Sequence, residues 1–126
     1  MRRAIGLSVA GLMLFAGGIL VGQRTVAPKK TLIHAFAFQP VEGTTPAQLD
    51  ELWSATRKMA GEIPEMRSIW MGKVTNRSGN FYGVAMEFDN QAGLKVYADH
   101  AAHRAWEQVY FKVRQEGTQS YDIQGQ

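Results

Sequence analysis

The sequence predicts an α+β fold class: a four-stranded antiparallel sheet with helices on one face, preceded by an N-terminal hydrophobic helix. Three observations lead to this class. Four short stretches after residue 30 alternate apolar side chains as strands do, and stretches between them place apolar residues at helical spacing. The first 30 residues differ in character, because they contain basic residues and no acidic one. A chain of 126 residues has room for one small domain behind such a leader.

Residues 1–22 are predicted to form a signal peptide or a signal-anchor helix. Arg2 and Arg3 precede an uncharged run over 4–22, which is longer than the roughly 7–15 residues of a cleavable signal and near the ~20 that span a bilayer. The best cleavage match, "TVA", is followed by Pro28, so an uncleaved anchor is favoured and a cleaved signal stays open. The charges favour an exported domain, periplasmic or extracellular, which residues 4–22 anchor to the membrane if they are retained. A linker over 23–30 then leads into the domain of residues 31–126.

The domain itself is mildly acidic, although the whole chain carries a formal charge of +3. Five of the 14 Lys and Arg lie in the first 30 residues, which leaves nine against all 11 acidic residues and a net charge of −2. A nucleic-acid-binding domain presents a basic face, so nucleic acid is not a predicted partner. The sequence contains no cysteine, which excludes disulfides, cysteine zinc sites and a thiol nucleophile.

The first strand and the first helix follow one another directly. The strand is "TLIHAFAFQ", which alternates two mostly apolar faces, one with Leu32, His34, Phe36 and Phe38 and the other with Ile33, Ala35 and Ala37. Thr45 fits the N-cap of a helix, with Pro46 at its first position and Gln48 completing a capping box. An apolar stripe continues to Ile63, and Pro64 ends the helix.

The remaining elements are a hairpin, two helical stretches and a last strand. "MRSIWMGKVT" and "FYGVAMEF" flank the glycine-containing loop "NRSGN", a pattern typical of an antiparallel hairpin. Asp89 or Asn90 caps a short helix, and a second helical stretch covers about 102–115. After Gly117, "TQSYDIQ" is the final strand.

The order β-α-β-β-α-β is that of the ferredoxin-like fold, in which the helices cover one face of the sheet. The open side is predicted to offer Phe36 and Phe38 together with alternating apolar residues of the hairpin, among them Trp70. A monomer of this size should not leave such a face in water. We therefore expect a symmetric homodimer joined through its sheet faces.

Two histidines and a tyrosine stand close together in "YADHAAH". On one continuous helix Tyr97 and His103 would point about 240° apart, so they can face one cavity only if the chain bends near 99–102. The alternative is that His103 only braces the helix junction by bonding to the backbone. His34, on the first strand, is either a satisfied interior histidine or a cavity base that moves protons. Together with His100 these histidines could suit zinc, but their spacing is a weak signal, so neither a metal site nor a cofactor is predicted.

Several segments carry a family resemblance. "IHAFAF", "IPEM", "WMGK", "MEFDNQAGLKVYADHAAH" and the closing "YDI" resemble the stress-responsive A/B barrel domain family, called Dabb, over about residues 31–124. The resemblance implies a homodimer whose two sheets form a barrel, with a cavity between sheet and helices in each protomer. Family members usually have a proline after the first of the two helix histidines, where this chain has Ala101.

The resemblance also implies candidate site residues. Most members have no established activity, while a plant member is a polyketide cyclase that uses a tyrosine and a histidine as acid and base. By position, these roles fall on His34, Tyr97 and His103. The cyclase has a further tyrosine on its first helix, where this chain has Thr56, a departure that weakens the case for polyketide chemistry. The residues predicted to line the ligand cavity are Phe36, Trp53, Thr56 and His100.

Three functions stay open from sequence. The first is an exported or membrane-tethered homodimeric module that binds a small apolar or phenolic ligand, or has a structural role, without catalysis. The second is a cofactor-independent enzyme acting through His34, Tyr97 and His103. The third, a haem-binding or oxygenase-like protein, rests on fold relatives alone. If the three side chains do not converge on one pocket, the enzyme hypothesis falls.

Overall fold

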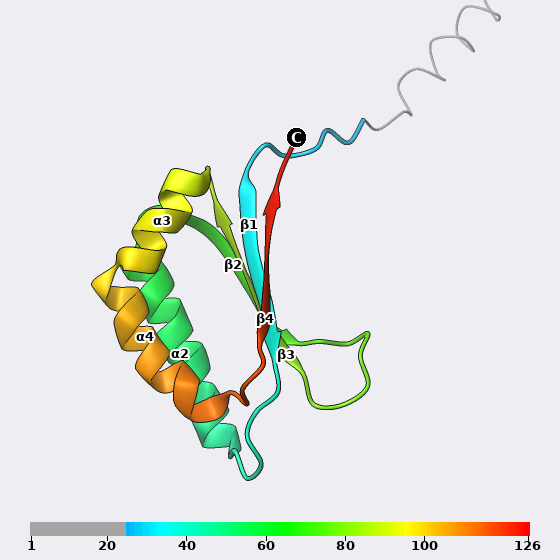
Figure 1. The fold of residues 1–126 in the computed structure, drawn as a ribbon, viewed down its shortest axis with the longest axis vertical. Helices are drawn as coiled ribbons and strands as arrows, with labels where there is room; N and C mark the ends of the chain where they lie inside the picture. The colour runs from blue at the N-terminus through cyan, green and yellow to red at the C-terminus, as the bar shows by residue number, and fades with distance from the viewer. Residues whose placement is uncertain (1–24) are drawn as a thin grey trace, which may run out of the picture.

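The computed structural model describes residues 25–126, and the predicted leader lies outside them. The elements are β1 (Leu32–Phe38), α2 (Pro46–Glu62), β2 (Met66–Lys73), β3 (Tyr82–Phe88), α3 (Gln91–Asp99), α4 (Ala101–Val113) and β4 (Gln119–Gln124). The strands form one antiparallel sheet in the order β2-β3-β1-β4, and the three helices lie on one face of it (Figure 1). The fold is the predicted ferredoxin-like α+β fold. None of the helices within 25–126 is long and apolar enough to cross a membrane.

Helix α2 begins as its sequence predicts. The Gln48 backbone N–H donates to Thr45 Oγ1 over 3.2 Å, and the Thr45 backbone N–H donates to Gln48 Oε1 over 2.8 Å. Pro46 occupies the first turn, where a missing N–H costs no helical hydrogen bond. The capping box therefore fixes the start of the helix that packs against α4.

The chain bends between α3 and α4, which decides between the bent junction and the continuous helix that the sequence left open. His100 has φ −74° and ψ 141°, an extended conformation that ends α3 and makes His100 the N-cap of α4. The ring Nδ1 of His100 accepts a hydrogen bond from the Ala102 backbone N–H over 3.0 Å. The bend thus forms with alanine at position 101, because the histidine side chain satisfies a backbone donor that the new helix leaves free.

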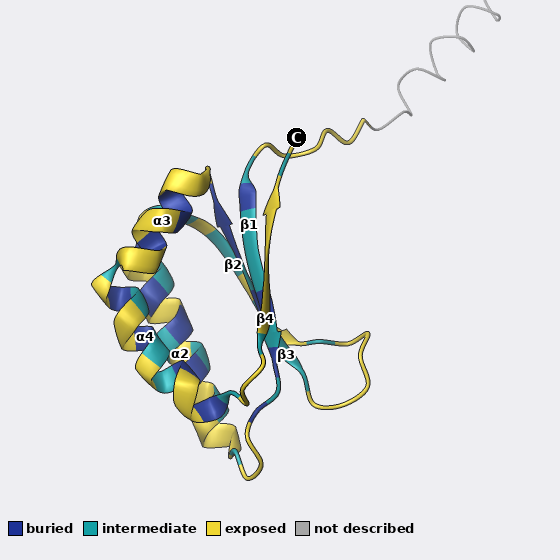
Figure 2. Cartoon of the chain, viewed as in Figure 1, coloured by how far each residue is buried: buried dark blue, intermediate teal, exposed yellow. Residues whose placement is uncertain are grey.

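The core lies between the sheet and the helices, where the buried residues face one another (Figure 2). The prediction that Phe36 and Phe38 lie on the open face is wrong, since both are in this core with exposed fractions of 7% and 2%. Alternation in a sequence separates the two faces of a strand but does not say which one meets the helices. Close packing explains the outcome, because large side chains are needed to fill the layer between helices and sheet.

The open face of the sheet is formed by small residues flanked by large ones. Ala35, Ala37 and Ala85 line a shallow groove of about 790 Å³ in the centre. Trp70 from β2 and Tyr121 from β4 also line this groove, and they are 55% and 60% exposed. This apolar surface is wider than scattered single residues, and it is what a second sheet would cover.

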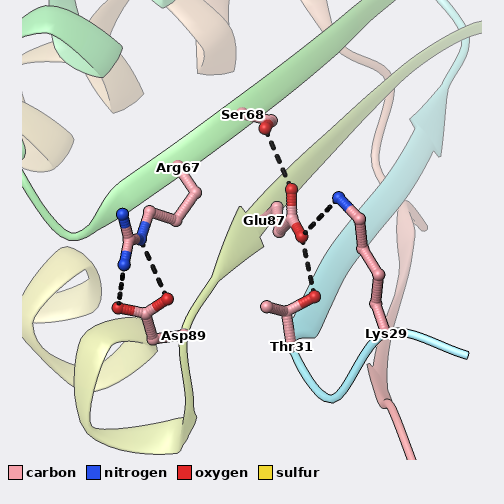
Figure 3. A network of polar contacts seen from close by, with 6 residues as sticks. All are labelled: Lys29, Thr31, Arg67, Ser68, Glu87 and Asp89. Carbon is pink, nitrogen blue, oxygen red and sulfur yellow. Dashed lines mark hydrogen bonds and ion pairs between the residues drawn. The ribbon is translucent and has the colours of Figure 1, made fainter.

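A polar network joins the start of the domain to the same sheet (Figure 3). The buried Glu87 carboxylate accepts hydrogen bonds from Thr31 Oγ1 over 2.7 Å, from Ser68 Oγ over 2.9 Å and from Lys29 Nζ over 3.2 Å. These bonds to Thr31 and Ser68, with the charge of Lys29, lower the pKa of Glu87. The network holds the segment before β1 against β2 and β3.

Candidate functional site

A pocket of about 220 Å³ opens between α4 and the side of the sheet formed by β1 and β4. Its apolar walls are aromatic, with Phe36 from β1 and Trp106, Tyr110 and Phe111 from α4. Its polar lining comes from His34, Tyr97, His103, Glu107, Arg114, Thr118 and Ser120. The three residues predicted to be catalytic therefore line one pocket, although they come from β1, α3 and α4.

His34 is paired with a carboxylate from the neighbouring strand. Antiparallel pairing of β1 with β4 sets His34 opposite Asp122, and His34 Nδ1 lies 2.6 Å from Asp122 Oδ1. The carboxylate accepts the Nδ1–H, so in the neutral ring the free Nε2 is the proton acceptor. Within 25–126 no hydrogen-bond partner is found for this Nε2. The pair has the arrangement of an oriented general base.

Tyr97 lies between the two histidines. Its ring centroid is 5.9 Å from that of His34 and 4.2 Å from that of His103. The side chain is buried, and burial raises the pKa of Tyr97, with smaller contributions from the charges of Glu107 and Tyr110. At neutral pH the hydroxyl therefore stays protonated, and it can donate a hydrogen bond to an oxygen atom of a ligand.

His103 braces the helix junction and also lines the pocket. Its Nδ1 lies 3.2 Å from the Ala98 carbonyl oxygen, so it braces the α3–α4 junction from the second helix. Its Nε2 lies 3.7 Å from Glu107 Oε1, and its ring stacks on Trp106 at a centroid distance of 5.8 Å. The bend at His100 makes this possible, because it turns Tyr97 and His103 toward the same space.

Of the residues predicted to line a cavity, only Phe36 is part of this pocket's lining. Trp53 packs instead against Phe38 and Tyr82, at centroid distances of 6.3 and 5.8 Å. Thr56 is fully buried, and its Oγ1 accepts a hydrogen bond from Trp106 Nε1 over 2.9 Å. His100 caps α4. Thr56 thus supports the pocket from behind, by holding the indole that forms its wall.

Sequence reasoning missed Asp122, Glu107 and Arg114. A signal for Asp122 was present, because the first and last strands of this fold are neighbours and "YDI" alternates Asp122 with Tyr121 and Ile123. No comparable sequence signal marks Glu107 or Arg114 as pocket residues, since many charged residues on a helix are simply solvated. Within the described part of the chain, no group of three or more His, Asp or Glu side chains is placed to hold a metal ion.

Residues 32–124 match the family described as the stress responsive A/B barrel domain, Dabb. The chain belongs to the Dabb family. No curated protein matches this Dabb chain closely enough to add a function.

Solved structures resemble the Dabb chain in fold. A dimeric ferredoxin-like protein of unknown function from Thermobifida fusca is 20% identical with a TM-score of 0.64, covering 81% of this chain and 98% of its own. A protein from Arabidopsis thaliana is 16% identical with a TM-score of 0.67, covering 74% and 93%. SnoaB from Streptomyces nogalater, described as a cofactor-independent oxygenase, is 7% identical with a TM-score of 0.63, covering 78% and 95%. At these identities the likeness shows the fold. The matched region makes up 98%, 93% and 95% of these three solved chains, so in them the fold is nearly the whole protein.

Proposed function

We propose that this Dabb domain is a homodimeric module that binds a small, largely apolar aromatic or phenolic ligand in the α4–β1–β4 pocket. The observation that carries the proposal is the convergence of His34, Tyr97 and His103 on one aromatic-walled pocket. Convergent polar groups in an apolar concavity are the usual form of a small-molecule site. The volume of about 220 Å³ lies below the roughly 300–1,000 Å³ typical of sites for drug-sized ligands, so the ligand is small and haem is not favoured.

The polar groups point to a phenol or a carbonyl compound rather than a pure hydrocarbon. Tyr97 offers a hydroxyl donor, and His34 Nε2 offers an acceptor beside it. A ligand hydroxyl can donate to the imidazole while it accepts from the tyrosine. The rings of Trp106 and Tyr110, stacked at 4.6 Å, provide the wall for an aromatic body.

Calorimetric titration of the full chain in lipid nanodiscs with 4-ethylphenol tests the proposal. We expect saturable binding, weakened roughly 2- to 12-fold in Tyr97→Phe, the value of one net hydrogen bond of about 0.5–1.5 kcal/mol. Val96→Ala, on the exposed side of α3, is the matched control and should bind as the wild type does. Absence of saturable binding, or equal affinity in Tyr97→Phe, would remove the proposal.

Acid–base catalysis without a cofactor is the second candidate, and the Asp122–His34 pair favours it. His34 Nε2 would take a proton from a carbon next to a carbonyl group, while Tyr97 donates a hydrogen bond to the enolate oxygen. Asp122 would stabilise the imidazolium that results. The cofactor-independent oxygenase among the fold neighbours supports such chemistry in this fold but does not establish it here.

Exchange of ligand protons with D₂O tests this second candidate function directly. The methyl protons of 4-hydroxyacetophenone should exchange with D₂O faster in the presence of the protein, as followed by NMR. His34→Gln should lower the protein-dependent rate by about 10²–10⁴, the usual contribution of a general base. Asp122→Asn should lower it less, because it only orients the ring. If His34→Gln exchanges as fast as the wild type, the protein has no base at this position.

The homodimer is proposed from the open sheet face and from fold neighbours described as dimeric. Trp70, Tyr121 and Ile123 are all more than half exposed on this face, and a symmetric partner would bury them. Sedimentation of residues 25–126 should give a dimer, which Trp70→Glu should dissociate and the control Val96→Glu should not. A monomeric wild type would contradict the sheet-to-sheet arrangement.

Export and membrane attachment through residues 4–22 also belong to this proposal. They rest on the two arginines before an uncharged run in the sequence. Protease added to spheroplasts, whose cytoplasmic membrane is intact and accessible, should degrade the domain. Full protection, with the domain degraded only after lysis, would place it inside.

A further inference from the structure

Arg114, at the C-terminal end of α4, contributes a positive charge to the lining of the pocket. His103 and Arg114 are both in or at the end of α4 and both line the pocket. His103 and Arg114 are eleven residues apart, which separates their backbones by about 16 Å along a helix, so the two side chains would contact different parts of a ligand. Thr118 lines the pocket near Arg114, and its Oγ1 accepts from Tyr110 OH over 3.3 Å.

The Arg114 guanidinium is held in place by rings rather than by a carboxylate. Its Cζ lies 4.8 Å from the ring centroid of Phe111 and 5.5 Å from that of Tyr110. Its Nε is buried and has no hydrogen-bond partner within residues 25–126. Among the ion pairs of the described chain, none involves Arg114. Since a guanidinium has five donors in a fixed fork, it can still take a carboxylate in two parallel bonds.

The other charge in the pocket lining favours the same orientation of an anion. Glu107 is the acidic residue that lines the pocket, and it lies beside His103, two turns of α4 before Arg114. Its carboxylate repels an anionic group at the His103 end and leaves the Arg114 end favourable. A cation at the C-terminus of a helix also offsets the helix dipole, which explains a positive charge at this position. It does not explain a guanidinium stacked on two pocket rings with a buried, unpaired donor.

From this geometry we infer that the pocket takes an aromatic acid, with its phenol or carbonyl oxygen at Tyr97 and His34 and its carboxylate on Arg114. The inference rests on the proposed ligand binding and deepens it by naming the chemical class. Arg114 is then the residue that selects an anionic ligand over a neutral one of the same shape. Thr118 and Ser120, at the β4 side of the same pocket, present hydroxyls that can donate to the second carboxylate oxygen.

A pair of matched probes tests the inference in the full chain in nanodiscs. 4-Hydroxycinnamate and its neutral amide differ in charge and hardly in shape, and both are titrated calorimetrically. The wild type should bind the acid about tenfold or more tightly than the amide, as a charge-assisted bidentate contact gives. Arg114→Gln should bring the two affinities within about twofold of each other by weakening only the acid. Arg114→Lys should retain part of the preference, because it keeps the charge and loses the fork.

Each outcome has a definite consequence. Equal binding of acid and amide by the wild type overturns the inference while leaving the proposed ligand binding in place. An unchanged preference in a folded Arg114→Gln, with a wild-type thermal midpoint, also overturns it. Failure of both probes to bind the wild type overturns the inference, and failure of 4-ethylphenol as well overturns the proposed function. The wild-type comparison needs no variant, so it holds even if Arg114→Gln does not fold.

Discussion

Replacing Thr56 by valine should destabilise the domain although it hardly changes side-chain volume. Thr56 is fully buried, and its Oγ1 accepts the Trp106 indole N–H over 2.9 Å and donates to the Leu52 carbonyl oxygen over 2.7 Å. Valine leaves the indole N–H buried without a partner, which costs about 1–3 kcal/mol. The Leu52 carbonyl oxygen keeps its backbone hydrogen bond within α2, so the loss of the Thr56 hydroxyl there adds little to this cost. For a domain of about 100 residues, a loss of about 2 kcal/mol lowers the melting temperature by about 8–16 °C.

A double-mutant cycle isolates this hydrogen bond. Urea unfolding of Thr56→Val, Trp106→Phe and the double variant gives the coupling free energy, which we expect to be about 1–2 kcal/mol. The control Thr56→Ser keeps the hydroxyl and loses one methyl group, at a cost of about 1 kcal/mol. Additive effects, or a Thr56→Val protein within about 0.5 kcal/mol of the wild type, would refute the account of Thr56 as the support of the pocket wall.

Three further outcomes follow from single residues. The pKa of Tyr97 is raised in the folded protein. The stability that this tyrosine contributes is therefore complete below the pKa of about 10 that tyrosine has in the unfolded chain, and it is lost as the pH rises above that pKa. Urea unfolding from pH 8 to 11 should therefore show a steeper alkaline decline in the wild type than in Tyr97→Phe, and equal slopes would contradict this. Because the pKa of Glu87 is lowered below 4.5, its contribution is present above that value and is lost as pH falls through the folded value. Glu87→Gln should flatten the acid limb of stability between pH 5 and 3, and an unchanged limb would show that the network has no such effect. Ala101→Pro should stabilise the domain by about 0.4–1 kcal/mol in urea unfolding, because position 101 begins α4 and His100 already has the extended backbone that precedes proline. Destabilisation would mean that the junction needs the Ala101 N–H.

Local features of the structure could be predicted from sequence where a short segment determines them. The capping box at Thr45 depends on residues three positions apart, and the bend near His100 was required for Tyr97 and His103 to share a space. The order of elements gave the sheet, since few topologies accommodate it. The family resemblance then placed His34 on the same pocket, a contact between residues more than 60 positions apart that local patterns do not contain.

The features that were missed depend on which surfaces meet. Phe36 was assigned to the wrong face because alternation is symmetric until the helices are placed. Asp122 becomes the partner of His34 only through the register of β1 with β4, and a shift of one residue would turn it to the open face. Arg114 is part of the pocket because its side chain folds over Phe111 and Tyr110, a choice of conformation that no spacing encodes.

A crystal structure of the domain with 4-hydroxycinnamate tests the central claim most directly, because it shows where an aromatic acid binds and which way it points. The account predicts the ring against Trp106 and Tyr110, the phenol oxygen within hydrogen-bond distance of Tyr97 or His34, and the carboxylate on Arg114. A ligand bound on the open sheet face, or one in the pocket with its carboxylate turned toward Glu107, would contradict it.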